Sequence, residues 1–473
     1  MNRRWMMAAM AVGVTAGCTP VEADTAEPEP LAVESAPTPR PPEPQAQTPS
    51  QPNRAGGLSV EVIPQYSKVL AGSRGHMDVL VRLQADEVPG AERPPLDLAL
   101  VLDRSGSMGG EKLAAAKQAA METVRKLEPD DRLTFVSYDD RVNVHTHRAK
   151  VGDGKALQRQ ILRIVDGGGT ALGPALRSGL DELTGAQRGD DVLAHLMLLS
   201  DGLANEGESR PDVLASWTAK AFGQGVATST LGVGLDYNED LMTKIADAGG
   251  GRYHFIEDGS KVPEVLGDEF AGLTATVARN VTVEVDAAAG IELDGIPGYP
   301  NVVDGDAILA KVGSMSAGRK RELLVRMDYQ PPQGKTMALG TYTLRFRNVL
   351  DDGKPVEIVV EPSVEVTDDA AAADASENYA VTVRAQEIDV AAALQSASEQ
   401  VNEGNYEEAR RDLEKKAETL RQQAVENPDV NYAPMLDDLE EAEKDLDKAK
   451  DSLIERKRYQ KKSKAKAYKK RKK

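Results

Sequence analysis

The sequence has 473 residues, more than one ordinary hydrophobic core accommodates, so we expect two or three domains joined by linkers. Aromatic residues make up 4% of the chain and its formal net charge is -18, as is typical of a soluble, acidic protein with modest cores. This acidity argues against nucleic acid as a partner of the main body. Cys18 is the single cysteine, so an internal disulfide is excluded.

Residues 1–18 have the pattern of an export signal. A basic start is followed by an apolar stretch from Trp5 to Val14 and by small residues before Cys18. The pattern resembles a bacterial lipoprotein signal, which implies that Cys18 is lipidated and anchors the protein to a membrane of the cell envelope, at the outer membrane or cell surface rather than the inner membrane. Thr15 stands where such signals usually carry Leu, and a plain cleaved secretion signal is the alternative. The apolar stretch is too short to span a bilayer, and no later one approaches the roughly 20 residues required.

Residues 19–57 contain ten prolines among Glu, Thr, Gln and Ala, which predicts a disordered, extended tether. Segments with apolar residues at every second position follow in 58–94, among them LSVEVIP, and return in 273–367, among them VTVEV and TYTLRF. This alternation is typical of half-buried strands. We expect one β-sandwich assembled from both flanks, with two independent small β units as the alternative.

The middle of the chain, residues 95–272, alternates apolar strands with amphipathic helices. This order predicts a doubly wound α/β domain, in which a mostly parallel sheet is covered by helices on both faces. The predicted strands are Leu96–Leu102, Arg132–Tyr138, Leu193–Leu199 and Ala227–Val233, and the predicted helices lie near 111–127, 155–165, 171–185, 211–222 and 239–248.

Beyond a break at Asp368–Glu377, residues 378–455 carry apolar residues at intervals of three and four, as amphipathic helices do. The segment from Asn427 to Pro434 divides them into two runs, so we expect a small helical hairpin for protein contact. The phrase beginning Gly404-Asn405-Tyr406 looks like a tetratricopeptide helix start, but a single copy cannot form a solenoid. Residues 456–473 hold twelve Lys and Arg and no acidic residue, which predicts a basic tail.

Conspicuous polar groups gather in three loops of the predicted α/β domain. Asp103-Arg104-Ser105-Gly106-Ser107 follows the first strand, Gly167–Thr170 precedes a helix, and Ser200-Asp201-Gly202 ends the apolar run LMLLS. Helix caps and turns explain each loop taken singly. In open α/β sheets, however, ligands bind at the carboxyl ends of strands, where such loops meet. Their joint occurrence on one sheet therefore favours a common site.

The combination resembles the von Willebrand factor type A domain with its metal-ion-dependent adhesion site, which uses a D-x-S-x-S loop, a distant Thr and a distant Asp. The resemblance covers roughly residues 95–272 and assigns the metal ligands to Asp103, Ser105, Ser107, Thr170 and Asp201. It implies that a Glu or Asp of a protein partner completes the coordination of the metal. The flanking β segments are also similar to those of bacterial envelope proteins described as Ca-activated-channel-like, although no channel is implied without a spanning segment.

The chemistry of these residues supports a divalent cation independently. Oxygen ligands with few carboxylates suit a hard cation such as Mg²⁺, with Mn²⁺ or Ca²⁺ as alternatives. Two Asp charges only balance the ion and three hydroxyls are neutral, so the ion is left electrophilic enough to attract another anion. Gly106 lets the loop turn back, and Thr170, just before a helix, is placed to change its contact with the metal when a ligand binds.

Enzymatic and nucleotide-binding functions fit the same residues less well. A phosphoryl-transfer enzyme of the haloacid dehalogenase type needs a second carboxylate where Ser105 stands, and Ser107 lies outside the G-x-S-x-G pattern of serine hydrolases. Gly232-Val233-Gly234 completes neither G-x-G-x-x-G nor a Walker sequence. His145 and His147 are spaced for zinc, but no Cys or nearby third ligand supports such a site, so we expect them on a hairpin surface.

We therefore predict a metal-dependent protein-binding module of the bacterial cell envelope, and not an enzyme. Since a secreted protein would rarely meet nucleic acid, the basic tail is expected to contact anionic envelope polymers, lipid head groups or an acidic protein, or to be merely solvated. The alternative from another class is a structural envelope protein with a metal-free scaffold, acting through its helical hairpin and basic tail.

Overall fold

The structure is a computed structural model that describes residues 53–88, 93–185, 187–189, 191–299, 302–304, 307–428 and 430–473. The predicted signal, 1–18, and the predicted tether up to residue 52 lie outside these described residues. Over the described part of the chain, no helix combines the length and the apolar character needed to cross a membrane.

The predicted tether is wrong for its last five residues. Strand β1 (Asn53–Ala55) pairs with β2 (Leu58–Pro64) across a turn at Gly56 and Gly57. Both glycines have positive φ angles, 56° and 81°, which a tight hairpin turn needs and which glycine adopts without strain. The sandwich therefore begins inside the segment predicted as tether.

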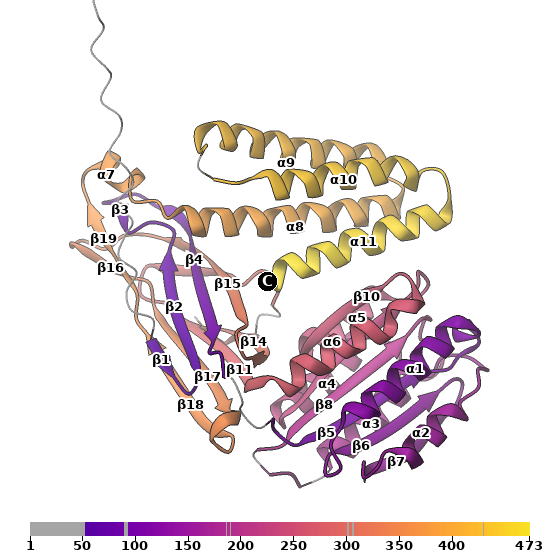
Figure 1. The fold of residues 1–473 in the computed structure, drawn as a ribbon. Helices are drawn as coiled ribbons and strands as arrows, with labels where there is room; N and C mark the ends of the chain where they lie inside the picture. The colour runs from indigo at the N-terminus through magenta and orange to yellow at the C-terminus, as the bar shows by residue number, and fades with distance from the viewer. Residues whose placement is uncertain are drawn as a thin grey trace, which may run out of the picture. The chain divides into compact units, whose positions relative to one another are not determined.

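The two flanks of the central domain assemble into one β-sandwich (Figure 1). The strands of the first sheet lie in the order β1, β2, β4 (Gly75–Ala85), β15 (Lys320–Tyr329), β12 (Ile291–Gly295). Those of the second lie in the order β13 (Val302–Asp304), β14 (Ala307–Ser316), β11 (Thr276–Asp286), β17 (Thr341–Asn348), β18 (Lys354–Val360), and the short helix η3 (Val349–Asp351) follows β17 in the chain. A smaller sheet has the order β16 (Thr336–Ala338), β19 (Ser363–Thr367), β3 (Lys68–Leu70). β4 from the N-terminal flank pairs with β15 from the C-terminal flank, from Gly75 opposite Tyr329 to Gln84 opposite Lys320. The two larger sheets share one buried core, so the predicted single sandwich is confirmed and two independent β units are excluded.

The central domain is a six-stranded sheet with helices on both faces, which confirms the predicted doubly wound α/β fold. The strands lie in the order β10 (Gly250–Ile256), β9 (Val226–Val233), β8 (Leu193–Ser200), β5 (Leu96–Asp103), β6 (Arg132–Tyr138), β7 (Val142–Lys150), and all neighbours are parallel except β6 and β7. The chain proceeds from β5 to β6 on one side and later returns to place β8 on the other side of β5. The sheet therefore has its topological switch point between β5 and β8, where ligands of such folds bind.

Each face of this sheet is buried by three helices. Residues of α1 (Glu111–Lys126), α2 (Lys155–Leu162) and α6 (Val262–Thr274) share one buried core with the sheet, and residues of α3 (Leu172–Thr184), α4 (Pro211–Gly223) and α5 (Glu239–Ala248) share the other; η1 is Gly106–Met108 and η2 is Gly259–Lys261. The five predicted helices are confirmed near their expected bounds. Strand β10 and helix α6 were not predicted, and β7, which is not among the four predicted strands, forms with β6 the hairpin on which His145 and His147 were expected.

The C-terminal region contains four long helices, so the predicted two-helix hairpin is wrong in size. After α7 (Ala370–Asp374) the chain forms α8 (Tyr379–Glu403), α9 (Tyr406–Glu426), α10 (Ala433–Ala449) and α11 (Leu453–Arg471). Apolar residues of all four, including Leu394, Leu413, Leu439 and Tyr459, share one buried core. Gly404 ends α8 with a positive φ of 87°, which reverses the chain into α9.

The predicted basic tail, 456–473, is wrong as a separate segment, because residues 456–471 belong to α11. The side chain of Ser452 caps this helix by accepting a hydrogen bond from the backbone nitrogen of Glu455 at 3.2 Å. Acidic residues of other elements neutralise its charge; on α10, Asp438 pairs with Lys466 at 2.8 Å and with Lys470 at 2.5 Å. The segment is therefore packed rather than merely solvated.

Candidate metal centre

The structure brings the predicted metal ligands to one edge of the central sheet. Asp103 is the last residue of β5 and Asp201 directly follows β8, so the two carboxylates lie at the switch point. Ser105 and Ser107 belong to the turn after β5, and Thr170 lies in the loop before α3. The D-x-S-x-S turn and the two distant residues thus converge as the topology requires.

Both carboxylate oxygens of Asp103 accept hydrogen bonds. Oδ1 accepts from the backbone nitrogen of Ser105 at 2.8 Å, and Oδ2 accepts from the hydroxyl of Ser200 at 2.6 Å. Burial raises the pKa of the Asp103 carboxyl above its usual value, and hydrogen bonds from the two serines oppose part of that rise. A cation beside this carboxylate would offset the same desolvation.

The side chains of Ser105, Ser107 and Asp201 form a continuous row of oxygens. The two serine Oγ atoms lie 3.1 Å apart, and Ser107 Oγ donates to Asp201 Oδ1 at 2.7 Å. Neighbouring ligand oxygens around an octahedral Mg²⁺, each about 2.1 Å from the ion, are about 3.0 Å apart. The donor set therefore fits a hard divalent cation in both chemistry and spacing. Asp201 is buried and Ser107 is exposed, so the site opens to solvent at Ser107.

Thr170 faces the same site through Gly202. A β-carbon placed on Gly202 would lie 3.1 Å from Thr170 Oγ1 and 3.4 Å from Ser107 Oγ, so the absence of a side chain at 202 lets both hydroxyls approach. The backbone of Thr170 is held by Asn205, whose Oδ1 accepts from the Thr170 nitrogen at 2.8 Å. This threonine is thus positioned by the loop that also carries Asp201.

Three residues of this site were not predicted: Ser200, Asn205 and Lys112. Lys112, at the start of α1, places Nζ 2.5 Å from Asp201 Oδ2 and donates to the backbone oxygen of Ser107 at 3.3 Å. Ser200 directly precedes Asp201 in the sequence, so its position next to a predicted ligand could have indicated that it belongs to the site. Lys112 carried no such signal, because its contact with Asp201 depends on the turn at η1 that brings α1 back over the strand end.

The paired histidines of the predicted hairpin contact different partners. His145 Nε2 lies 2.7 Å from Ser137 Oγ, and His147 Nδ1 lies 2.7 Å from Glu182 Oε1. Within the described ranges, no three His, Cys, Asp or Glu side chains are grouped as a metal site would require. The structure thus gives no support to zinc at these histidines.

Comparison with known proteins places the central domain in a family. The family model of the von Willebrand factor type A domain matches residues 97–268, which extend from β5 into α6. Residues 97–268 are a von Willebrand factor type A (VWA) domain. Domains of this family are protein-interaction modules.

Relatives of the chain extend beyond the VWA domain. The uncharacterized protein sll0103 of Synechocystis is 26% identical over 314 residues, which cover 63% of this chain and 73% of that protein. The uncharacterized protein YfbK of Escherichia coli is 30% identical over 216 residues, 44% of this chain and 36% of that protein. A von Willebrand factor type A structure from Catenulispora acidiphila has a TM-score of 0.64 at 19% identity, covering 85% of this chain and 91% of that one. This structural likeness shows that the fold recurs outside the VWA domain as well.

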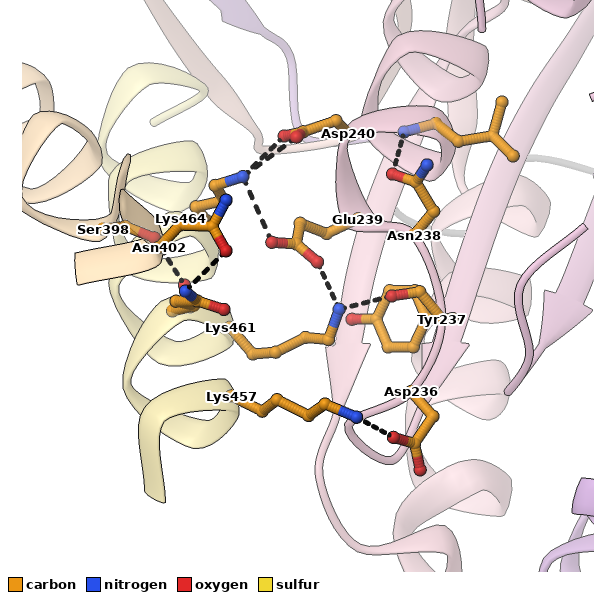
Figure 2. A network of polar contacts seen from close by, with 12 residues as sticks. Asp236, Tyr237, Asn238, Glu239, Asp240, Ser398, Asn402, Lys457, Lys461 and Lys464 are labelled. Carbon is orange, nitrogen blue, oxygen red and sulfur yellow. Dashed lines mark hydrogen bonds and ion pairs between the residues drawn. The ribbon is translucent and has the colours of Figure 1, made fainter. Parts of the chain in front are cut away.

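Helix α11 contacts the VWA domain through a network of polar side chains (Figure 2). Lys457 pairs with Asp236 at 2.7 Å, and Lys461 donates to the backbone oxygen of Tyr237 at 2.5 Å and pairs with Glu239. Asp236 and Tyr237 lie on the loop from β9 to α5, and Glu239 is the first residue of α5. They follow the carboxyl end of β9, at the same edge of the sheet as Asp103 at the end of β5. A β-carbon on Gly234 in this loop would lie 3.4 Å from Lys112 Nζ, so the loop adjoins the lysine that pairs with Asp201.

Proposed function

We propose that the VWA domain binds a divalent cation, Mg²⁺ or else Mn²⁺ or Ca²⁺, and through it a carboxylate of a protein partner. The supporting observation is the convergence of two buried carboxylates and three hydroxyls at the switch point between β5 and β8. The ligands we assign are Asp103, Ser105, Ser107, Thr170 and Asp201. The proposed role is binding and not catalysis.

The residues at the proposed metal site have different roles. Asp103 and Asp201 supply two negative charges, and the three hydroxyls supply neutral oxygens, so the set neutralises a divalent ion without an excess of negative charge. Hydrogen bonds from Ser200 and Ser105 hold the Asp103 carboxylate in place. The ion supplies, when bound, a Lewis-acidic position that a Glu or Asp of the partner fills. Because Ser107 is exposed, the partner's carboxylate approaches the set from that side.

A titration with Mn²⁺, followed by electron paramagnetic resonance, tests the metal site. We expect saturable binding of one ion to the wild-type chain and none to Asp103→Ala. Asp130→Ala is the matched control, because Asp130 is an exposed aspartate of the same domain, paired only with exposed Lys150. Binding of Mn²⁺ that Asp103→Ala leaves intact would refute the assignment.

The partner is tested by capture in Mg²⁺ and in EDTA. A protein that binds through the ion should be retained by the wild-type chain in Mg²⁺ and released by EDTA, and Asp103→Ala should not retain it. A partner that remains bound in EDTA would show that the interaction does not use the ion.

A structural role without metal is the second candidate, and one contact favours it. Lys112 already places an ammonium against Asp201, so the chain itself supplies part of the charge that a metal would. Under this alternative, α11 and the other C-terminal helices make the contacts with the cell envelope. The Mn²⁺ titration separates the candidates, since the scaffold alone predicts no saturable binding.

We propose that the chain is a lipoprotein anchored at the outer membrane or cell surface through Cys18. The support is the sequence of residues 1–18, which lie outside the described residues. Cys18→Ser should move the protein from the membrane fraction to the soluble fraction. Retention of the variant at the membrane would refute the anchor.

A further inference from the structure

A cavity of about 300 Å³ lies between the edge of the VWA domain, the sandwich and α11. Its walls come from β10, α6, β14, β15 and the last turn of α11. The residues of β10 in its lining, Gly250–His254, open that strand, whereas the candidate metal ligands follow the ends of β5 and β8. The cavity is therefore separate from the metal site, at the other end of the parallel strands.

Positive charge predominates in the lining. Six of its side chains are cationic and two are carboxylates; the cationic ones are Arg252, Lys311, Arg321, Lys469, Lys472 and Lys473, and the carboxylates are Asp247 and Glu269. Such an excess inside a concave, partly desolvated site attracts anions, because the low-dielectric walls concentrate the field.

The two carboxylates of the lining are already engaged. Glu269 accepts from Ser229 Oγ at 2.5 Å with one oxygen and lies 2.9 Å from His254 Nε2 with the other. Asp247 pairs with Lys472 at 2.9 Å. Glu269 also pairs with Arg252 at 4.0 Å, so both carboxylates face lining cations other than Lys311, Arg321 and Lys469.

Three cations of the lining have no carboxylate partner within the described part of the chain: Lys311, Arg321 and Lys469. The guanidinium of Arg321, on β15, is half-buried, and burial lowers its pKa. Burial also lowers the pKa of Lys311. A desolvated charge without a counter-charge is costly, and an anion in the cavity would relieve that cost.

We propose that this cavity binds a small ligand that carries a phosphate group. A phosphate monoester brings close to two negative charges and three acceptor oxygens in one group, which suits a lining with three cations that lack a carboxylate partner better than a single carboxylate does. The guanidinium of Arg321 suits two of those oxygens, and Lys469 on α11 and Lys311 on β14 belong to the same lining. Tyr299 and Tyr468 provide ring surface in the lining for the rest of an organic phosphate.

Calorimetric titration of the full chain with inorganic phosphate and with glycerol phosphate tests this site. The experiment is run at constant ionic strength and in EDTA, so that its outcome is independent of the metal site. We expect saturable binding, with acetate as a monovalent control that does not bind. Tighter binding of glycerol phosphate would assign the site to a phosphate ester, such as a lipid head group, and equal binding would assign it to free phosphate. Saturable binding of neither would overturn the proposal.

Two variants locate the binding in the cavity. Arg321→Met and Lys469→Met should each weaken phosphate binding at least tenfold. Lys415→Met is the matched control, because Lys415 is an exposed lysine on α9 outside the lining, and it should leave the affinity unchanged. Without phosphate, Arg321→Met should melt no lower than the wild type, since it removes a desolvated charge, and this separates lost binding from misfolding. Equal affinities of the wild type and both cavity variants would overturn the proposal.

Discussion

Lys112 and Asp201 form an ion pair inside the candidate metal site, with Nζ 2.5 Å from Oδ2. The other oxygen of the same carboxylate accepts from Ser107 Oγ at 2.7 Å. The carboxylate is thus shared between an ammonium group and the row of hydroxyls. A divalent ion bound to these oxygens would have to share Asp201 with Lys112 and tolerate its charge.

Lys112→Met should therefore tighten the binding of Mn²⁺. Removal of one nearby positive charge from a half-exposed position is worth about 1 kcal/mol, or roughly a fivefold change in affinity. The measurement is the Mn²⁺ titration described above. Lys126→Met, an exposed lysine at the end of the same helix, is the control and should have no effect. Weaker binding by Lys112→Met would mean that the lysine holds Asp201 in place for the ion.

Gly202→Ala should weaken the binding of Mn²⁺ while the domain stays folded. The added β-carbon would press on the hydroxyls of Thr170 and Ser107, at 3.1 and 3.4 Å, so both must shift by a few tenths of an ångström. We expect about a tenfold loss of affinity and less than about 1.5 kcal/mol of destabilisation, because the overpacking is slight. Gly223→Ala is the matched control, since a β-carbon there meets no atom within 4 Å. Equal affinities for the two variants would show that the hydroxyls do not contribute.

The free energy of unfolding of the VWA domain should decrease as the pH is lowered, because of His195. Burial lowers the pKa of this imidazole from 6.5 to about 4, although the nearby carboxylate of Glu269 opposes the shift. Between these values the unfolded chain binds a proton that the folded chain does not, so stability is complete above pH 6.5 and is lost as the pH falls towards 4. At pH 5 the loss is about 2 kcal/mol, at about 1.4 kcal/mol per pH unit.

Denaturant unfolding at pH 7 and pH 5 checks this value. Trp217 lies on α4 of the VWA domain and reports its unfolding by fluorescence when Trp5 is replaced by Phe. His195→Gln should reduce the difference between the two pH values by about 2 kcal/mol. His76→Gln, at an exposed histidine of the sandwich, should leave the difference unchanged. The same difference in wild type and His195→Gln would contradict the prediction.

Glu239→Gln should loosen α11 from the VWA domain. Lys461 is buried, and burial lowers the pKa of its ammonium group. The neighbouring carboxylate of Glu239 raises that pKa, so it stabilises the charged form of Lys461. Loss of one partner from a buried pair costs about 3 kcal/mol, and Lys461→Met in addition should recover part of it. Hydrogen exchange along 453–471 measures the effect. Asp240→Asn, which removes an exposed partner of Lys464, should change exchange little. No faster exchange in Glu239→Gln would show that the pair does not hold the helix.

The central sheet and the convergence of the five ligands could be predicted because both follow from local pattern. Four strands rich in apolar residues predict a parallel sheet. Asp103 and Asp201 lie at the carboxyl ends of two of these strands, so they meet at the same edge of the sheet. β7 and β10 are absent from the predicted strands because both are edge strands: β7 carries polar, half-exposed or exposed residues such as Asn143 and His145, and β10 begins with two glycines. An edge strand buries too little on either face to leave a clear alternation.

Helix α11 could not be predicted because its burial does not rest on an apolar stripe. Tyr459 and Tyr468 are its only large buried apolar side chains, and the lysines around them have the composition of a solvated tail. Their counter-charges lie on distant segments, such as Asp236 for Lys457 and Asp438 for Lys466. Contacts between residues so far apart along the chain leave no periodic signal in either segment.

The sandwich whose two halves flank the VWA domain has a consequence for the order in which the parts of the chain fold. Arg82 on β4 and Glu322 on β15 pair across 240 positions of sequence, so β2 and β4 emerge long before the strand that covers them. Contacts between residues so far apart in the sequence form slowly, and the uncovered edge of β4 is open to non-native pairing until β15 reaches it. The VWA domain, whose sheet pairs only strands of its own segment from β5 to β10, can fold first and then bring the two halves together. The folding of the VWA domain would then be the step that limits the folding rate of the whole chain.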